Sequence, residues 1–373
     1  MRRECYGNMK RGKAMRRINQ SRVERVRKKR IKKWLFRAVF LSLAVIILSG
    51  SYLFYRTWDA AADTHKPMER EKSKLRENAP TLDKPFTVLL LGTDVRKETD
   101  NWRADVIMVA AINPKTQSVK LVSIPRDSYV EIANTGGHRD KINSAPYWGK
   151  QKGVDPVTNT AETIELLLNV PIDYYAKVNF KGFIDIVDAL GGVDVNVKFD
   201  FWEKKLGRQE RYYFTKGPMH LNGDQALSYV RMRKRDPRGD LGRNERQREV
   251  LMNLMDKAVS FKGLTKINEI LGILGENVST SFKVEEMIAL QNLARKISKD
   301  NIESIEMNVT NGTARIGSFN ASIVQISEEE RQRISKILRE HLELDPPSSP
   351  EGSTPDSGIP DTPQGSGESQ NSY

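Results

Sequence analysis

The chain has 373 residues, of which 38% are hydrophobic and 29% are charged, and its formal net charge is +13. Residues 1–33 contain 15 of the 61 lysines and arginines but only two of the 48 acidic residues, so the remainder of the chain is neutral. The length allows one sizeable domain with appendages or two small domains. The basic charge belongs to a tail and therefore gives no support to a nucleic-acid partner.

An apolar segment follows the basic tail. Residues 34–55 span 22 positions with a single charged side chain, Arg37, and about 20 apolar residues cross a bilayer core. We predict a transmembrane helix over 34–55, with residues 1–33 in the cytoplasm and the later residues outside the cell. The alternative is a signal peptide cleaved near Ala60–Ala62, but the basic and apolar segments are both longer than signal peptides usually have.

The segment after the predicted helix is polar, and we interpret residues 56–84 as a juxtamembrane spacer or helix. The only cysteine, Cys5, lies in the basic tail. We therefore expect neither disulfides nor thiol chemistry in the exported part of the chain.

Strand and helix patterns alternate over residues 85–343, which predicts one α/β or α+β domain. Short apolar runs bounded by turn residues predict strands, and apolar residues at helical spacing after capping residues such as Asn222 and Ser327 predict helices. Residues 134–157 are expected to form a polar loop, and the Pro/Ser/Gly-rich tail 344–373 is expected to be disordered. The predicted strands are 86–92, 104–113, 118–125, 174–180, 193–197 and 302–309, and the predicted helices are 160–168, 182–190, 221–233, 243–260, 264–275, 283–297 and 327–342.

Familiar nucleophile, zinc and nucleotide motifs are missing from the sequence. It contains no HExxH, GxSxG or Walker loop, and its four histidines are scattered. A histidine metal cluster or a Ser-His-Asp site is therefore not expected. Carboxylates and arginines remain as the candidate chemistry.

Two aspartates and one arginine flank the first three predicted strands. Asp94 follows the first strand, Asp105 begins the second, and Arg126 follows the third. Carboxylates at the end of one strand and the start of its neighbour can meet at one edge of the sheet, where Mg²⁺ accepts one or two carboxylates with phosphate oxygens and waters. The alternative is that both aspartates cap turns.

An arginine-rich run follows the predicted helix over 221–233. Arg231 and Arg233 lie roughly 200° apart on an ideal helix, so they can face one site only if the helix ends near residue 231. Arg243 and Gln247 are four residues apart and share a helix face. Guanidinium groups bind phosphate oxygens bidentately, which suits a pyrophosphate, although a solvated loop between helices is the alternative. Three further arginines of the run are expected to be solvated: Arg235, Arg238 and Arg246.

The motifs LLLGTD, RAD, SIPRD, DKINSA, GGVDV, LNGDQALSYVRMR and GRNERQ occur in this order over about residues 86–255. This series resembles the LytR-CpsA-Psr family, and most closely its Gram-positive enzymes that attach wall teichoic acid or capsular polymer to peptidoglycan. The resemblance implies one transmembrane anchor and a single extracellular catalytic domain with a central mixed β-sheet flanked by helices. The sequence departs from the family pattern in the loop VRKETDNW before Asp105, which carries extra charge. We therefore expect the entrance of the site to differ from that of other family members.

The resemblance also implies a reaction and the residues that perform it. The enzyme moves a glycopolymer from a polyprenyl-pyrophosphate carrier to a sugar hydroxyl of peptidoglycan, and forms a phosphodiester. Mg²⁺, or Mn²⁺ in its place, is expected on Asp94 and Asp105, and either Asp94 or Asp127 is expected to be the general base. With Arg126, the two metal-site aspartates are the expected catalytic residues, and the pyrophosphate is expected to contact Arg126, Arg231, Arg233, Arg243, Gln247 and Lys141.

Two other functions use the same residues or the same topology. Water in place of the sugar hydroxyl would make the protein a hydrolase of polyprenyl pyrophosphate. A membrane-bound transcription regulator is opposed by the neutral body, by the outward topology and by the absence of a helix-turn-helix in the tail. The expected partners are therefore the lipid-linked glycopolymer, peptidoglycan and membrane lipid, and not nucleic acid.

Overall fold

The structure is a computed structural model that describes residues 64–94, 102–260 and 277–345. The predicted transmembrane helix, the predicted helix over 264–275, most of the charged loop before Asp105 and nearly all of the C-terminal tail lie outside these residues. Within the described ranges, no helix is both long and apolar enough to cross a membrane.

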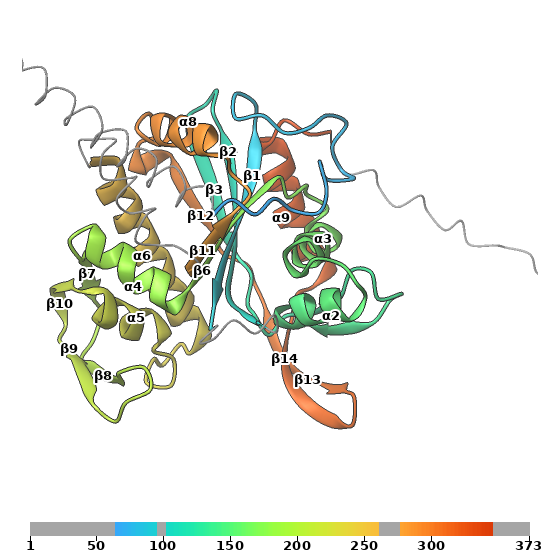
Figure 1. Ribbon diagram of the computed structural model, residues 1–373. Helices are drawn as coiled ribbons and strands as arrows, with labels where there is room; N and C mark the ends of the chain where they lie inside the picture. Colours follow the sequence, from blue (N-terminus) through green and yellow to red (C-terminus); the bar gives the residue numbers. More distant parts are fainter. Residues whose placement is uncertain (1–63, 95–101, 261–276, 346–373) are drawn as a thin grey trace, which may run out of the picture.

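A mixed six-stranded sheet forms the centre of the fold, in the order β11-β6-β1-β2-β3-β12 (Figure 1). The pairs β1–β6 and β3–β12 are parallel, and the other neighbouring pairs are antiparallel. This confirms the expected central mixed sheet. The strands are β1 (Phe86–Thr93), β2 (Ala104–Asn113), β3 (Ser118–Ser123), β6 (Tyr174–Asn179), β11 (Val278–Thr280) and β12 (Ile302–Ile305).

One face of the sheet is covered by α3 (Pro156–Leu168) and α9 (Glu328–His341), with the short α2 (Ala145–Gln151) beside them (Figure 1). The Asp155 side chain caps α3 by accepting a hydrogen bond from the Thr158 amide, and Ser327 caps α9 in the same way. Alternate strand side chains, including Leu89, Leu91 and Ile107, are buried in the apolar core beneath these helices.

The opposite face has two neighbours. At one end the strand side chains pack against α8 (Val284–Ala294). Beside the other end lies a second apolar cluster built from three helices and two small sheets. The elements of this cluster are α4 (Phe180–Ala189), α5 (Gly223–Arg231), α6 (Asp240–Ser260), the pair β7 (Val193–Val197) with β10 (Gly217–Leu221), and the pair β8 (Phe201–Lys204) with β9 (Arg211–Phe214).

Several elements differ from the sequence prediction. Residues 134–157 are not one loop, because they contain a strand, two helical segments and the start of α3. The helix α3 begins at Pro156, where proline is favoured at the first helical position, four residues before the predicted start. Elements without a predicted counterpart are β4 (Tyr129–Glu131), β5 (Arg139–Lys141), η1 (Ile142–Ser144), α2, β8, β9, β10, β11, η3 (Lys299–Asn301), β13 (Thr310–Ile316) and β14 (Phe319–Gln325).

The described part of the polar segment before β1 lies against the domain. Arg70 donates two hydrogen bonds of 2.8 Å to the Glu165 carboxylate of α3. Arg76 donates to Asp173 at 3.0 and 2.6 Å, and the Lys66 amide donates to the Thr280 carbonyl of β11 at 2.8 Å. These bonds connect residues 64–84 to three separate parts of the fold.

Candidate active site

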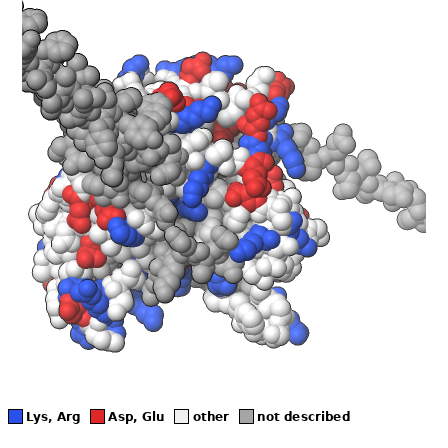
Figure 2. Space-filling model, in the orientation of Figure 1, with Lys and Arg blue, Asp and Glu red and all other residues white. Residues whose placement is uncertain are grey.

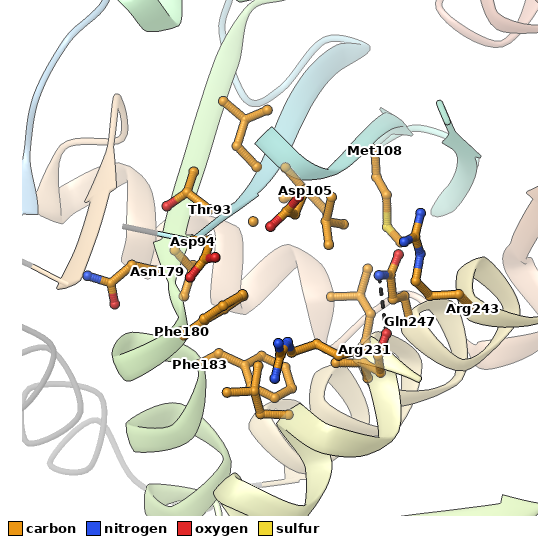
Figure 3. A pocket seen from close by; sticks show the side chains of 18 of the residues that line it. Thr93, Asp94, Asp105, Met108, Asn179, Phe180, Phe183, Arg231, Arg243 and Gln247 are labelled. Carbon is orange, nitrogen blue, oxygen red and sulfur yellow. Dashed lines mark hydrogen bonds between the residues drawn. The ribbon is translucent and has the colours of Figure 1, made fainter. Parts of the chain in front are cut away.

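A cavity of about 690 Å³ lies between the sheet and the helices α4, α5 and α6. Its lining is mostly apolar. Asp94 and Asp105 lie at the strand ends, and Arg231 and Arg243 reach the cavity from helices (Figure 3). Seven of the eight site residues proposed from the sequence line it: Asp94, Asp105, Arg126, Arg231, Arg233, Arg243 and Gln247.

The two aspartates meet at the corner where β1 ends and β2 begins. Thr93 pairs with Ala104, and the register of the two strands shifts between Gly92 and Thr93. A Cβ on Gly92 would lie 2.9 Å from the Val106 Cβ, so the close approach of the strands requires glycine there. The register places Asp94 and Asp105 on the same cavity wall, as the strand pattern predicted.

Arg126 connects this corner to the strand β3. Its Nη1 donates a hydrogen bond of 2.5 Å to Asp105 Oδ1, and its Nε lies 3.6 Å from Asp127 Oδ2. Burial alone would raise the pKa of Asp127, but the hydrogen bond from Lys141 and the charges of Lys141, Arg126 and Arg233 together hold it below its ordinary value. Lys141 does not line the cavity. It pairs with Asp127 at 2.8 Å, and Asp127 in turn lies beside Arg126.

Arg231 and Arg233 reach one cavity because α5 ends at the first of them. The helix starts with a capping box between Asn222 and Gln225 and stops at Arg231. Met232 is extended, with ψ of 127°, and its backbone breaks the helical spacing between the two arginines. The condition set by the sequence is therefore met. The Arg231 guanidinium lies 5.2 Å from the centre of the Phe180 ring, at the boundary between the charged and apolar parts.

Arg243 and Gln247 approach the cavity from the first turns of α6. Both line it, which confirms the shared helix face predicted from their spacing. Gln247 Nε2 also donates to the Val230 carbonyl at 3.4 Å, which connects α6 to α5 (Figure 3).

The prediction that Arg246 is solvated is wrong. Its side chain is 7% exposed, and its Nη1 lies 2.5 Å from the fully buried Asp236 carboxylate. It also donates to the carbonyls of Tyr229 and Met232, which lie at the C-terminal end of α5 and have no partner in the helix. A Cβ on Gly242 would lie 1.8 Å from Asp236 Oδ2, so the closeness of the buried pair to α6 requires a glycine.

The other two arginines predicted to be solvated differ from each other. The Arg238 side chain is 53% exposed and pairs with Glu245 at 2.5 Å, in agreement with the prediction. Arg235 instead stacks on Trp202, with its Cζ 3.4 Å from the ring centre, and lies 3.5 Å from Glu203.

Apolar residues supply the rest of the cavity wall, and none of them was proposed from the sequence. Apart from Gly182 and Val187, the residues of α4 are not fully buried, although its sequence is rich in large apolar residues. That excess of apolar residues is the signal that could have pointed to the cavity. The apolar lining includes Leu90, Val106, Met108, Phe180, Phe183, Ile186, Leu190, Leu227, Val230, Leu251, Leu254 and Met255.

The charges that line the cavity favour an anionic ligand. The lining contains five cationic side chains and three carboxylates. The cations are Arg126, Arg231, Arg233, Arg243 and Lys234, and the carboxylates are Asp94, Asp105 and Glu203. Among the residues that the structure describes, no group of three or more His, Cys, Asp or Glu side chains could hold a metal alone. The pair Asp94 and Asp105 nevertheless fits Mg²⁺, which takes one or two protein carboxylates and completes its shell with phosphate and water oxygens.

Solved structures of similar proteins share this fold. The crystal structure of Bacillus subtilis TagV superimposes with a TM-score of 0.61 at 37% identity, and covers 71% of this chain and 100% of that one. A structure described as TagT bound to LIIa-WTA superimposes with a TM-score of 0.61 at 29% identity, and covers 75% of this chain and 100% of that one.

Sequence relatives point to the same group. The polyisoprenyl-teichoic acid–peptidoglycan teichoic acid transferase TagV of Bacillus subtilis (strain 168) is 38% identical over 314 residues, which is 83% of this chain and 78% of that protein. The corresponding transferase TagU of Bacillus anthracis (strain CDC 684 / NRRL 3495) is 39% identical over 308 residues, 81% of this chain and 95% of that protein. The LytR_cpsA_psr family model matches residues 51–340, and this chain is a member of that family.

Proposed function

We propose that this protein is a membrane-anchored phosphotransferase of the cell wall. It transfers an anionic glycopolymer of the teichoic acid type from a polyprenyl-pyrophosphate carrier to a sugar hydroxyl of peptidoglycan, and forms a phosphodiester. The observation that carries the proposal is that one cavity combines a mostly apolar lining with five cationic side chains. A polyprenyl pyrophosphate has a matching apolar and anionic part, and the named activities of TagV and TagU agree with this substrate class.

The arginines perform the positioning that phosphoryl transfer requires. Arg126, Arg231 and Arg243 approach from three different elements and surround the position proposed for the pyrophosphate. Their guanidinium groups neutralise its oxygens and stabilise polyprenyl phosphate as the leaving group. The acceptor oxygen forms the new bond to phosphorus as the bond to the leaving oxygen breaks, and the two oxygens stand in line.

The proton of the acceptor hydroxyl needs a carboxylate. Of the two candidates from the sequence, Asp94 lines the cavity, whereas Asp127 does not and is held by Lys141 and Arg126. The proposal therefore assigns the proton to the Asp94 carboxylate. Mg²⁺ or Mn²⁺ would be held by Asp94 and Asp105 with oxygens of the pyrophosphate, and when bound it adds positive charge beside the phosphorus.

The membrane anchor belongs to the proposal as well. The apolar residues 34–55 and the basic residues before them support a single-pass signal anchor with the catalytic domain outside the cell. That topology brings the cavity to the side of the membrane where peptidoglycan lies. No ATP is required there, because the activated carrier supplies the driving force.

Transfer by purified full-length protein in detergent, with a lipid-linked glycopolymer donor and peptidoglycan as acceptor, tests the proposed function. We expect Arg126→Ala or Arg243→Ala to reduce transfer by about 100-fold or more, as the loss of charge-stabilising groups typically does, with an unchanged circular dichroism spectrum. Arg238→Ala is the matched control, since it removes an exposed arginine of the same run. Normal transfer by either cavity variant would refute the assignment, and release of free phosphorylated glycopolymer by the wild type would identify the hydrolase instead.

The metal proposal has its own test. Asp94→Asn together with Asp105→Asn is expected to abolish the part of the activity that a chelator removes and Mg²⁺ restores. Because Asp105 also pairs with Arg126, a thermal unfolding curve must accompany the assay. Undiminished Mg²⁺-dependent activity in the double variant would show that the metal is held elsewhere.

A further inference from the structure

A second, polar groove of about 430 Å³ adjoins the cavity. It is formed by the hairpin of β8 and β9, and it shares the side chains of Glu203 and Arg231 with the cavity. Lysine and arginine side chains gather in Figure 2 at the lower left, where Figure 1 places this hairpin. The remaining residues that line the groove are Lys204, Lys205, Leu206, Gly207, Arg208 and Gln209.

The groove keeps a surplus of positive charge after its ion pairs are counted. Lys205 pairs with Glu210, and Glu203 is paired with Arg235 at 3.5 Å. The other cations of the groove are Lys204, Arg208 and Arg231, and none of the three forms an ion pair within 4.0 Å among the residues that the structure describes. Lys205, helped by the Arg208 charge, lowers the pKa of the exposed Glu210. The Lys204 ammonium donates a hydrogen bond of 3.1 Å to the neutral Gln209 amide oxygen. These cations are therefore available to an anion from outside.

The hairpin that carries these cations is held firmly at its base. Trp202 lies between two guanidinium groups, with the Arg211 Cζ at 3.7 Å and the Arg235 Cζ at 3.4 Å from its ring centre. On the other side of the hairpin, the rings of Phe201 and Phe214 stack at 4.7 Å inside the apolar cluster. These stacking contacts fix the base of the hairpin and thereby the positions from which Lys204 and Arg208 extend.

We propose that this groove binds the phosphodiester backbone of the polymer part of the donor. As a subsite it would favour donors that carry several phosphodiester units over donors that carry none. The inference rests on the proposed function, because Arg231 is then the side chain that connects the pyrophosphate position to the groove. The polymer is covalently attached to the phosphorus held there, and its next phosphates must leave the cavity close to Arg231. Exposed cations bind one phosphate weakly, but several in a row bind a repeating polyanion in a salt-dependent manner.

A kinetic comparison of two donors tests the subsite in the full-length protein in detergent. One donor is a lipid-linked disaccharide pyrophosphate without polyol phosphate, and the other carries several glycerol-phosphate units. Lys204→Glu with Arg208→Glu is expected to raise KM for the long donor by about tenfold, equivalent to one decade in affinity, while kcat and all parameters for the short donor stay unchanged. Lys336→Glu, an exposed reversal on α9, is the control and should alter neither donor. An equal effect on both donors, or no effect on the long one, overturns the proposal.

A binding measurement distinguishes the polymer from the acceptor, which also carries anionic groups. A free glycerol-phosphate oligomer is expected to bind the wild type and to lose about tenfold in affinity in the double variant, whereas binding of a muropeptide should not change. The reverse result would assign the groove to peptidoglycan and overturn the proposal. If the wild type transfers neither donor, the proposed function fails, and the oligomer titration still decides whether the groove binds phosphodiesters.

Discussion

The two faces of the central sheet carry similar apolar side chains but meet different surroundings. On one face, Leu89, Leu91 and Ile107 are 0–2% exposed beneath α3 and α9. On the other face, Leu90 and Val106 are only partly buried and line the cavity. Alternating apolar residues therefore determine where a sheet lies, whereas the helices around it determine whether a face becomes core or binding surface.

The buried ion pair of Arg246 and Asp236 stabilises the loop beside the cavity face of the sheet, which is called the open face below, in contrast to the closed face beneath α3 and α9. Arg246→Ala removes one partner of a buried ion pair and leaves the Asp236 carboxylate uncompensated, which costs about 3–5 kcal/mol of the free energy of unfolding. The measurement is a fall in the midpoint of thermal unfolding, together with loss of transfer, because Arg231 and Arg233 lie at the start of the loop that the pair holds. Arg238→Ala, at an exposed position of the same run, should change the midpoint little. An unchanged midpoint in Arg246→Ala would show that the open face does not depend on this pair.

A pair of matched substitutions compares the two faces directly. Ala111 is fully buried on the closed face, so Ala111→Leu should lower the free energy of unfolding by about 1–3 kcal/mol through overpacking. Ala176 lines the cavity, so Ala176→Leu should change the free energy of unfolding by about 0.5 kcal/mol or less but raise KM for the lipid-linked donor. Urea denaturation and the transfer assay measure the two effects. Equal destabilisation by both substitutions would mean that the cavity face is packed like the other.

Glu330, in the helix α9 that covers the closed face, makes the stability of the fold depend on pH. Glu330 at the start of α9 accepts hydrogen bonds from Arg333 and from the Asn308 amide, and the bond from Arg333 is the main cause of its pKa of about 2, below the ordinary 4.5. Because the folded-state pKa is lowered, the carboxylate stabilises the fold above pH 4.5 and loses this contribution as the pH falls toward about 2. Stability curves for wild type and Glu330→Gln should therefore converge on acidification, and parallel curves would exclude the contribution.

Local signals were sufficient for β1, β2, β3 and β6 of the central sheet and for several helix ends. The strand β2 has the predicted bounds, since a ten-residue apolar run between turn residues leaves few alternatives. The hairpin of β13 and β14 was missed because its sequence is polar and its position depends on distant contacts. One of these is the hydrogen bond of 2.9 Å from the Val324 amide to the Asp127 carbonyl.

The candidate site was predictable in its charges but not in its shape. The family motifs named the arginines and aspartates. The ending of α5 at Arg231 was a condition and not a prediction, because the helix was expected to run to residue 233 and Pro237 only permits an earlier end. Burial of Arg246 could not be foreseen, because it depends on the carbonyls that the end of α5 leaves without helical partners. The apolar lining was equally hidden, since a helix that faces a cavity has the same periodicity as one that faces a core.

The bonds that connect residues 64–84 to α3, to Asp173 and to β11 also limit how far the domain can stand from the bilayer. If the predicted anchor ends at residue 55, only residues 56–63 link it to the first described residue, Thr64. Fully extended, these eight residues reach about 28 Å. The enzyme would then work within a thin layer above the lipid surface, and a prenyl chain could enter its cavity without leaving the membrane completely.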